Sequence, residues 1–372
     1  MPPDGPLWRG DGIRAFWQRI SEGLTLQQLW GQFSREARES YRFYSKEFDS
    51  HVTDDTSWKG GFRLAGALFW AMIAKLSPAR RVFLLIALLL LVTGGPFERP
   101  AALTLGALGL LALLALELAD RVAMKRDLEI ARDIQRWLVP QSPPSEPGVD
   151  IAFTTLPANT VAGDYYDAFR CPAAGPGPAH RLVLVVADVA GKSMPAALLM
   201  ATFQSSLRTL VQEALPLDAL VSRLNRYCCQ HSLEGRRFTT AVIAELDPDS
   251  GTLVYVNAGH NPPALRRSSG EIEWLRAGGL PLGVQAEAAY ETGALALAGG
   301  DRLVIFTDGV VEARNDRGED YGDTRLAEWL RASRAATAAV AVSELVASVE
   351  AFAAGHRRED DVTVMVVHYR PA

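Results

Sequence analysis

Residues 239–256 have the sequence TTAVIAELDPDSGTLVYV, in which two short β-type runs flank a cluster of turn-forming residues. The runs Thr239–Leu246 and Thr252–Val256 are rich in β-branched and apolar side chains, as strands are. The five residues between them, Asp247–Gly251, include the Pro, Gly and Asp residues that favour a tight turn. Strands joined by so short a turn run antiparallel. We therefore expect a sheet that is not built only from parallel βαβ units.

Three further strands and two helical stretches are predicted outward from this hairpin. The strands are Leu182–Ala187, Arg302–Thr307 and Val362–Tyr369. The helical stretches are Ala196–Glu213 and Ala327–Ala354, the second divided into two helices. Hairpin-linked strands mixed with long helices favour an α+β fold over a doubly wound parallel sheet.

The composition bounds the class of protein. The chain has 372 residues, which exceeds a usual single core and predicts more than one folded unit. A charged fraction of 22% excludes a largely disordered chain, and a formal net charge of −5 gives no support for a nucleic-acid partner. The three cysteines, Cys171, Cys228 and Cys229, have neither a disulfide framework nor a metal-ligand spacing, which favours a reducing cytosolic compartment.

Two long apolar runs lie within residues 79–119, which we expect to form a two-span transmembrane hairpin. All residues from Val82 to Val92 are apolar, and the second run extends from Ala101 to Leu116. Each is somewhat shorter than the ~20 residues that cross a bilayer upright, and Glu117 stands near the end of the second. A buried hairpin in a soluble protein is the alternative, but helices with no polar side favour lipid.

Basic residues flank both runs. Arg80 and Arg81 precede the first, and three more basic residues follow the second between positions 121 and 126. Positive residues favour the cytoplasmic side of a membrane, so both ends of the hairpin are expected inside. The residues between the runs would then form a short external turn.

The segments on either side of the hairpin differ in character. Residues 1–78 form a polar and amphipathic N-terminal region whose role the sequence does not reveal, with Leu64–Ala74 as an interfacial or packing helix. Residues 120–147 are predicted to be a linker helix followed by a proline-rich connection. The helix carries one apolar face, made by Leu128, Ala131, Ile134 and Leu138. This face either forms a homodimer through residues 121–139 or packs on the next domain.

Aspartates stand at the ends of several apolar strands. Asp188 ends LVLVVAD, Asp308 ends RLVIFTD, Asp360 and Asp361 begin DDVTVMVV, and Asp164 lies in AGDYYD. Converging carboxylates repel one another unless a divalent cation neutralises them. Ligands that are all oxygen suit magnesium or manganese. Any one of these aspartates is more often a turn or cap residue, but four such positions make coincidence less attractive.

The ordered motifs of residues 128–369 resemble those of a known family. The segments ADVAGKSMPAALLMA, FTTAVIAELD, LVYVNAGHNPPAL, FTDGVVEARN and DDVTVMVV follow one another as in the SpoIIE-type bacterial branch of the PPM (protein phosphatase 2C) family. The resemblance implies a four-layer αββα sandwich of two antiparallel sheets over residues 148–370. It also implies two divalent cations, Mn²⁺ or Mg²⁺, at one end of the sandwich.

The resemblance assigns metal-binding roles to residues at two strand ends. Asp188 resembles the aspartate that bridges both metals, and the backbone carbonyl of Val189 matches a further ligand position. Asp308 resembles a ligand of the second metal. Hydrolysis by a metal-activated water follows from such a site, with no phosphorylated enzyme intermediate.

Three more acidic residues complete the expected site. Asp164 resembles the early acidic position that holds metal-bound water, and Asp360 resembles the late metal ligand. Asp361 is an adjacent candidate ligand that spacing does not separate from Asp360. Asp164, Asp188 and Asp308 are thus the expected catalytic residues.

Two residues depart from the family pattern. Ala162 replaces the first glycine of GGDYYD, and Ser193 replaces the glycine after the lysine of ADVSGKG. Both changes add a small side chain near the expected site, but neither removes a ligand.

Three basic or titratable residues have competing interpretations. His260 in NAGHNPPAL is expected to order a turn, with a role as general acid as the alternative. Lys192 and Arg267 can attract a phosphate, but solvated surface charges are the default interpretation.

Together these features predict a membrane-anchored, metal-dependent protein-serine/threonine phosphatase, multi-pass in a bacterial inner membrane with its catalytic domain in the cytoplasm. The resemblance implies phosphoserine hydrolysis on a regulatory protein, such as an anti-sigma-factor antagonist of the sulfate-transporter/anti-sigma (STAS) fold. The alternative is a membrane-tethered adaptor, a pseudophosphatase that binds a partner without turnover. The sequence does not reveal the substrate, the activating signal or the oligomeric state.

Overall fold

The structure, a computed structural model, describes residues 73, 76–94, 100–172, 180–191, 194–231, 237–356 and 358–371. The chain divides into two compact units, Met1–Arg121 and Val122–Ala372. Nearly all of the N-terminal region 1–78, including almost all of Leu64–Ala74, lies outside the described residues, as do Lys192 and Ser193.

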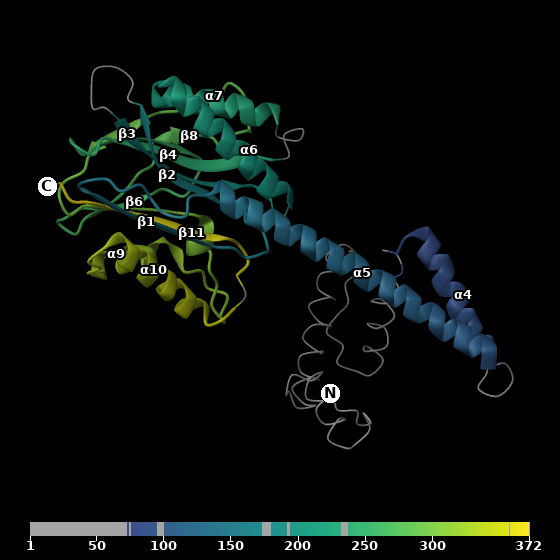
Figure 1. The fold of residues 1–372 in the computed structure, drawn as a ribbon. Helices are drawn as coiled ribbons and strands as arrows, with labels where there is room; N and C mark the ends of the chain where they lie inside the picture. The colour runs from purple at the N-terminus through teal and green to yellow at the C-terminus, as the bar shows by residue number, and fades with distance from the viewer. Residues whose placement is uncertain are drawn as a thin grey trace, which may run out of the picture. The chain divides into compact units, whose positions relative to one another are not determined.

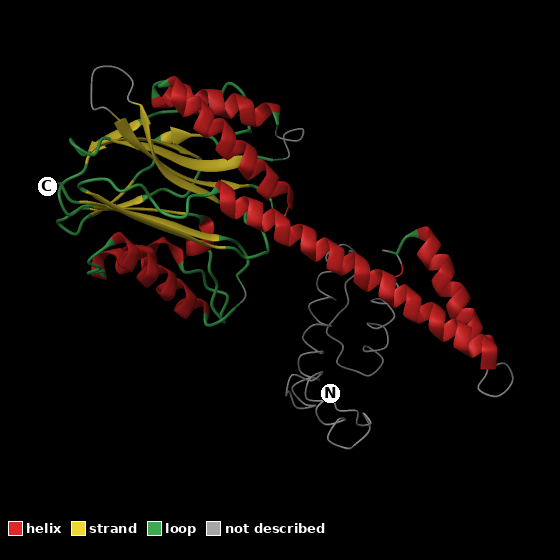
Figure 2. Ribbon diagram, viewed as in Figure 1, coloured by secondary structure: helices red, strands yellow, loops and turns green. Residues whose placement is uncertain are grey.

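The unit Val122–Ala372 is built around two β-sheets that lie face to face (Figures 1 and 2). One sheet has the strand order β1 (Val149–Leu156), β11 (Val362–Tyr369), β10 (Arg302–Phe306), β6 (Ala264–Arg266) and β7 (Ile272–Trp274). The other has the order β2 (Tyr165–Pro172), β3 (His180–Val189), β4 (Thr239–Leu246), β5 (Thr252–Ala258) and β8 (Gly278–Gly279), with β9 (Gly293–Ala296) also paired to β5.

Helices cover the outer face of each sheet (Figure 2). On the β3 sheet lie α6 (Met194–Leu210), the short 3₁₀ helix η1 (Val211–Glu213) and α7 (Leu217–Gln230). On the β11 sheet lie α8 (Asp308–Val311), α9 (Gly322–Ala332) and α10 (Ala338–Ala353). The predicted α+β, four-layer sandwich is thereby confirmed. Its sheets are antiparallel except for the two-residue pairing of β5 with β8, which is parallel.

The central strands are apolar along most of their length because both of their faces are buried. In β3, Val183 and Val185 point to the layer of α6 and α7, whereas Leu182 and Leu184 point to the core between the sheets. Strand β11 alternates in the same way between the core and α10. This double burial explains the uninterrupted apolar runs that the strands show in the sequence.

A buried ion pair fixes α6 to its sheet. The carboxylate of Asp167 in β2 is fully buried and accepts hydrogen bonds from Arg208 Nε (2.8 Å) and Nη2 (2.9 Å) and from the Tyr165 hydroxyl (2.5 Å). A buried carboxylate needs such partners to remain charged. Of the two aspartates in AGDYYD, Asp167 is therefore structural.

The other unit contains α4 (Pro78–Gly94) and the first part of α5 (Pro100–Leu138), helices of 17 and 39 residues. The two helices approach closely: a Cβ on Gly106 would lie only 2.8 Å from the Ala87 carbonyl oxygen. Small residues permit this spacing in helix pairs. Arg80, near the start of α4, forms salt bridges with Glu117 (3.3 Å) and Asp120 (2.6 Å) of α5. Glu117, near the end of the second apolar run, thus has a basic partner.

Large apolar side chains of both helices face outward. Among the described residues, one helix, α5, is long and apolar enough to cross a membrane, by length and composition alone. The exposed set comprises Val82, Phe83, Leu85, Ile86, Leu89 and Val92 in α4, and Leu103, Leu105, Leu108, Leu111, Leu114, Leu116 and Leu118 in α5.

The second apolar run and the linker helix form one continuous helix, α5. Leu128, Ala131 and Leu138 are half-buried, as predicted for its apolar face. Ile134, the fourth residue of this face, has a side chain that is 55% exposed. Gln135 is half-buried in its place, because helical periodicity permits a step of three or four residues from Ala131.

Candidate metal-dependent active site

The expected aspartates lie at one end of the two sheets. Antiparallel pairing sets Tyr165 of β2 opposite Ala187 of β3, so Asp164 and Asp188 stand at the same strand ends. In the other sheet, pairing sets Phe306 of β10 opposite Val364 of β11. Asp308 follows β10, and Asp360 and Asp361 precede β11, so these three carboxylates also share one sheet end.

Thr307 joins the two groups of carboxylates. Its side chain is fully buried, and its hydroxyl donates to Asp164 Oδ2 at 2.9 Å. The same hydroxyl oxygen accepts the backbone N–H of Thr363 at 3.0 Å. A residue at the end of β10 therefore holds an aspartate of the opposite sheet in place.

Asp361 organises the loop that carries Asp164. Its two carboxylate oxygens accept the backbone N–H groups of Ala158 and Gly163, each at 2.7 Å. Its own N–H donates to Asp360 Oδ1 at 3.0 Å. Asp361 is buried, whereas Asp360 is half-buried beside a cavity. The two adjacent aspartates thus have different surroundings.

Two glycines permit the close packing at this end of the sheets. A Cβ on Gly163 would lie 3.2 Å from the Val189 carbonyl oxygen and 3.6 Å from Asp188 Oδ1. A Cβ on Gly309 would fall 2.1 Å from the Asp361 carbonyl oxygen, so no side chain fits there. The glycine after Asp308 is therefore required for α8 to begin against β11.

Mutual repulsion is visible in the acidity of these groups. Burial, followed by repulsion from Asp308, Asp360 and Asp361, raises the pKa of Asp188 to about 7. Burial and then repulsion from Asp188 hold the pKa of Asp164 well above its ordinary value. Carboxylates that raise one another's pKa in this way favour a bound cation, which offsets their charge.

The donor set fits a hard divalent cation. Asp164, Asp188, Asp308 and Asp360 offer carboxylate oxygens, and Val189 offers a carbonyl oxygen, which are the ligands that magnesium and manganese prefer. Within the described part of the chain, no three His, Cys, Asp or Glu side chains form a closed metal-binding group as they stand. The carboxylates interact electrostatically around an open end of the sandwich.

Gln135 connects the linker helix to the acidic loop. Its side-chain amide donates to the Ala162 carbonyl at 2.6 Å and accepts the Ala162 N–H at 3.0 Å. Ala162 immediately precedes Gly163 and Asp164. The sequence pattern predicts no role for either residue: Thr307 lies in the segment FTDGVVEARN, and Gln135 lies in the predicted linker helix.

Two other candidate residues, His260 and Arg267, have structural contacts of their own. His260 is buried, with Nδ1 2.8 Å from the Thr240 hydroxyl, and its backbone is held by the Asn257 side chain. Burial lowers the pKa of His260 to about 4, so it is neutral at pH 7 and orders the turn. Arg267 pairs with Asp301 and Glu273 at the opposite end of β10 from Asp308.

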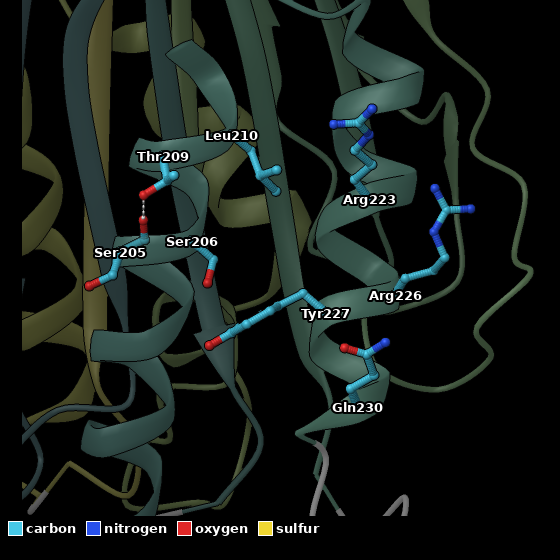
Figure 3. A pocket seen from close by; sticks show the side chains of 8 residues that line it. All are labelled: Ser205, Ser206, Thr209, Leu210, Arg223, Arg226, Tyr227 and Gln230. Carbon is cyan, nitrogen blue, oxygen red and sulfur yellow. Dashed lines mark hydrogen bonds between the residues drawn. The ribbon is translucent and has the colours of Figure 1, made fainter. Parts of the chain in front are cut away.

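A surface groove lies between α6 and α7 (Figure 3), with a volume of about 590 Å³. The hydroxyls of Ser205, Ser206 and Thr209 donate to carbonyls of their own helix. Ser205 lies 11 residues after the start of α6, which is about 16 Å along the helix. The groove is therefore separate from the strand ends that carry the carboxylates.

The sequence of this unit matches a known family. The profile described as Stage II sporulation protein E (SpoIIE) matches residues 178–370, which include Asp188, Asp308, Asp360 and Asp361. The chain belongs to the SpoIIE family.

Curated relatives extend the comparison beyond the SpoIIE profile. The phosphoserine phosphatase RsbU of Bacillus subtilis is 29% identical over 196 residues, covering 52% of this chain and 56% of RsbU. Protein IcfG of Synechocystis is 29% identical over 285 residues, covering 69% of this chain and 43% of IcfG. The chain thus spans about half the length of the curated relatives it matches.

A solved structure has the same fold. The SiaA-PP2C domain of Pseudomonas aeruginosa is 20% identical, with a TM-score of 0.58, covering 68% of this chain and 99% of that domain. The SpoIIE family unit of this chain therefore has a PP2C-type fold.

The acidity of Asp188 in this SpoIIE unit predicts a pH-dependent stability. Its pKa of about 7 in the metal-free folded chain exceeds the ordinary value of 3.8, so the folded state binds the proton more tightly than the unfolded state. This contribution is complete below about pH 4 and is lost as the pH rises through about 7. We expect the melting temperature of the EDTA-treated chain to fall between about pH 5.5 and pH 8.

The matched variant is Asp188→Asn, which cannot titrate. Its melting temperature should change less over the same pH interval, and other titrating groups cancel in the comparison. If the melting temperature of Asp188→Asn falls as steeply as that of the native chain, or more steeply, the raised pKa of Asp188 is not the cause of the pH dependence.

Proposed function

We propose that the chain is a divalent-metal-dependent protein-serine/threonine phosphatase, anchored in a membrane and acting on a cytoplasmic regulatory protein. The proposal rests chiefly on the buried carboxylates that the two sheets bring together and that raise one another's pKa. Membership of the SpoIIE family and the similarity to a named phosphoserine phosphatase, RsbU, support it. In this proposal residues 79–119 are the anchor, 120–147 the linker and 148–370 the phosphatase domain.

In this proposal the carboxylates of Asp188, Asp308 and Asp360 and the carbonyl of Val189 hold the cations. When bound, two such cations activate a water molecule and offset the charge of the phosphoryl group. Asp164 orients water at the same site, held in position by Thr307. Asp361 fixes the loop that carries Asp164 through its two backbone amide contacts, which favours Asp360 as the ligand of the pair.

For the substrate, we propose a phosphoserine protein of the anti-sigma-factor antagonist type, with a STAS fold. This follows from the resemblance to the SpoIIE-type branch.

Removing Asp308 tests the activity. With manganese and p-nitrophenyl phosphate, the full-length chain in detergent should release p-nitrophenol, and Asp308→Ala should reduce the rate by more than about 100-fold. This loss of rate is expected to exceed that caused by removing a residue that only contacts a ligand, because Asp308 is itself a proposed ligand.

The control is Asp249→Ala, which removes an exposed aspartate in the turn between β4 and β5. Its rate should match that of the native chain. Absence of metal-dependent release by the native chain, together with retained binding of a phosphoprotein, would instead favour the tethered adaptor.

The anchor in this proposal is the pair α4 and α5. Their outward apolar side chains, the close approach at Gly106 and the charge pairs of Arg80 at one end support a hairpin in lipid. With 17 residues, α4 is about 25 Å long, so it spans a ~30 Å hydrocarbon core only with local thinning of the bilayer. The basic residues at both open ends favour a cytoplasmic location for them.

A reporter fusion tests the hairpin. Alkaline phosphatase inserted after Phe97 in the turn should be active in the periplasm, because the enzyme is active only after export. The same reporter fused at the C-terminus, after Ala372, should be inactive. An inactive fusion at Phe97 in a stably expressed chain would contradict the two-span topology.

The linker part of α5 is the proposed control element and the proposed site of homodimer formation. Gln135, on the side facing the phosphatase domain, holds Ala162 in the acidic loop. The exposed Ile130, Ile134 and Trp137 recur at helical spacing on another side, where a second copy can pack. One helix thereby joins a dimer surface to the metal-binding loop.

Two neighbouring variants separate these roles. Gln135→Ala should raise the manganese concentration needed for half-maximal activity by about 10-fold or more, with the oligomeric state unchanged, because it loosens the acidic loop. Ile134→Asp should shift the chain toward monomer in analytical ultracentrifugation. Unchanged manganese dependence in the first variant and unchanged mass in the second would each contradict the assigned role.

A further inference from the structure

A cavity of about 740 Å³ adjoins the proposed metal site. Asp360 and Gly309 form part of its wall, so it is continuous with the end of the sandwich where the carboxylates lie. The rest of the wall comes from the end of β1, from α8 and the segment after it, from α10 and from the loop before β11. Its volume is within the range of pockets that bind ligands.

The floor of the cavity is apolar. Val349 and Val362 are buried in the core beneath α10, and Leu156 and Ala313 pack against that core. Val346 lines the same surface from α10. This floor offers no charged partner to a ligand, so it favours contact with an apolar group.

The charged residues of the cavity stand at its rim and neutralise one another. Arg314 pairs with Glu359 at 3.6 Å, and Arg358 pairs with Glu350 at 2.5 Å. His356 lies 2.9 Å from Asp316. Each cation at the rim thus has an acidic neighbour, and Glu312 and Asp360 add further negative charge to the lining. The lining therefore disfavours an anionic group, and its floor favours an apolar one.

We propose that this cavity binds an apolar side chain of the phosphoprotein substrate, close in sequence to its phosphoserine. The proposal rests on the proposed function, since a phosphoserine at the carboxylates brings the adjoining residues to the wall formed by Asp360 and Gly309. An extended chain spans about 10 Å in three residues, so the side chain belongs to a position within about three residues of the phosphoserine. The cavity thus selects sequence around the phosphoserine, whereas the carboxylates act on the phosphate.

Defined peptides test this selection. The probes are fluorescently labelled phosphoserine peptides in an Ala/Ser background, with a single Leu or Asn at each position from three before to three after the phosphoserine. Binding to the full-length chain in detergent with manganese is measured by fluorescence anisotropy, with Asp308→Asn used to prevent turnover. At one position at least, Leu should bind about 10-fold more tightly than Asn, as expected for one apolar group in a matching pocket.

Variants of α10 locate the selection in the cavity. Ala353→Trp fills the cavity from its α10 wall and should abolish the preference for Leu, and Ala353→Leu should weaken it. The matched control is Ala351→Trp, which places the same side chain on the exposed side of the same helix. It should keep the preference and hydrolyse p-nitrophenyl phosphate at the native rate in an otherwise native chain.

The outcomes separate this proposal from the proposed function. Equal binding of Leu and Asn peptides at every position, or a preference that persists in both Ala353 variants, overturns the cavity proposal. Failure of the native chain to hydrolyse p-nitrophenyl phosphate overturns the phosphatase proposal, and the peptide binding then still decides the role of the cavity.

Discussion

Repulsion among carboxylates at the end of the sandwich is the constraint around which this unit is organised. Asp188 belongs to one sheet and Asp308 to the other, and burial, followed by the proximity of Asp308, raises the pKa of Asp188. The free energy that keeps them together comes from the apolar core between the sheets, because nothing in the carboxylates themselves favours it. A divalent cation bound there would relieve this repulsion, and the stability of the fold and the affinity for metal would then be coupled at the same atoms.

The sequence predicted the elements whose pattern is set by burial on both faces. Strands β4 and β11 begin and end where expected, because nearly all of their residues are buried. Strands β1 and β2 were not predicted as strands, since VDIAFTTL and YYDAFRCP mix polar with apolar residues. In β2, Asp167 interrupts the pattern, and its buried partner Arg208 lies 41 residues later, beyond the reach of any local rule.

The sequence predicted which aspartates form the candidate site. It did not predict the contacts that each of them makes. Strand ends and family order pointed to Asp164, Asp188, Asp308, Asp360 and Asp361, and all five lie at one end of the sheets. The division of labour between Asp360 and Asp361 depends on backbone amides of a loop about 200 residues away in sequence. On the linker, the half-buried positions include Gln135 as well as Leu128, Ala131 and Leu138, because a helix step of three or four is not fixed by a short pattern.

In the proposed function, the residues that act on a phosphate are separate from those that contact the rest of a substrate. The carboxylates stand on strand ends, where a change of backbone geometry would disturb the core between the sheets. The adjoining cavity is lined largely by α10 and by loops, which tolerate substitution far better. Gln135 reaches the acidic loop from yet another element, the linker helix. The proposed metal chemistry, substrate selection and control would therefore vary separately. In the proposal they meet only through the short loop that carries Gly163 and Asp164 and through the wall formed by Gly309 and Asp360.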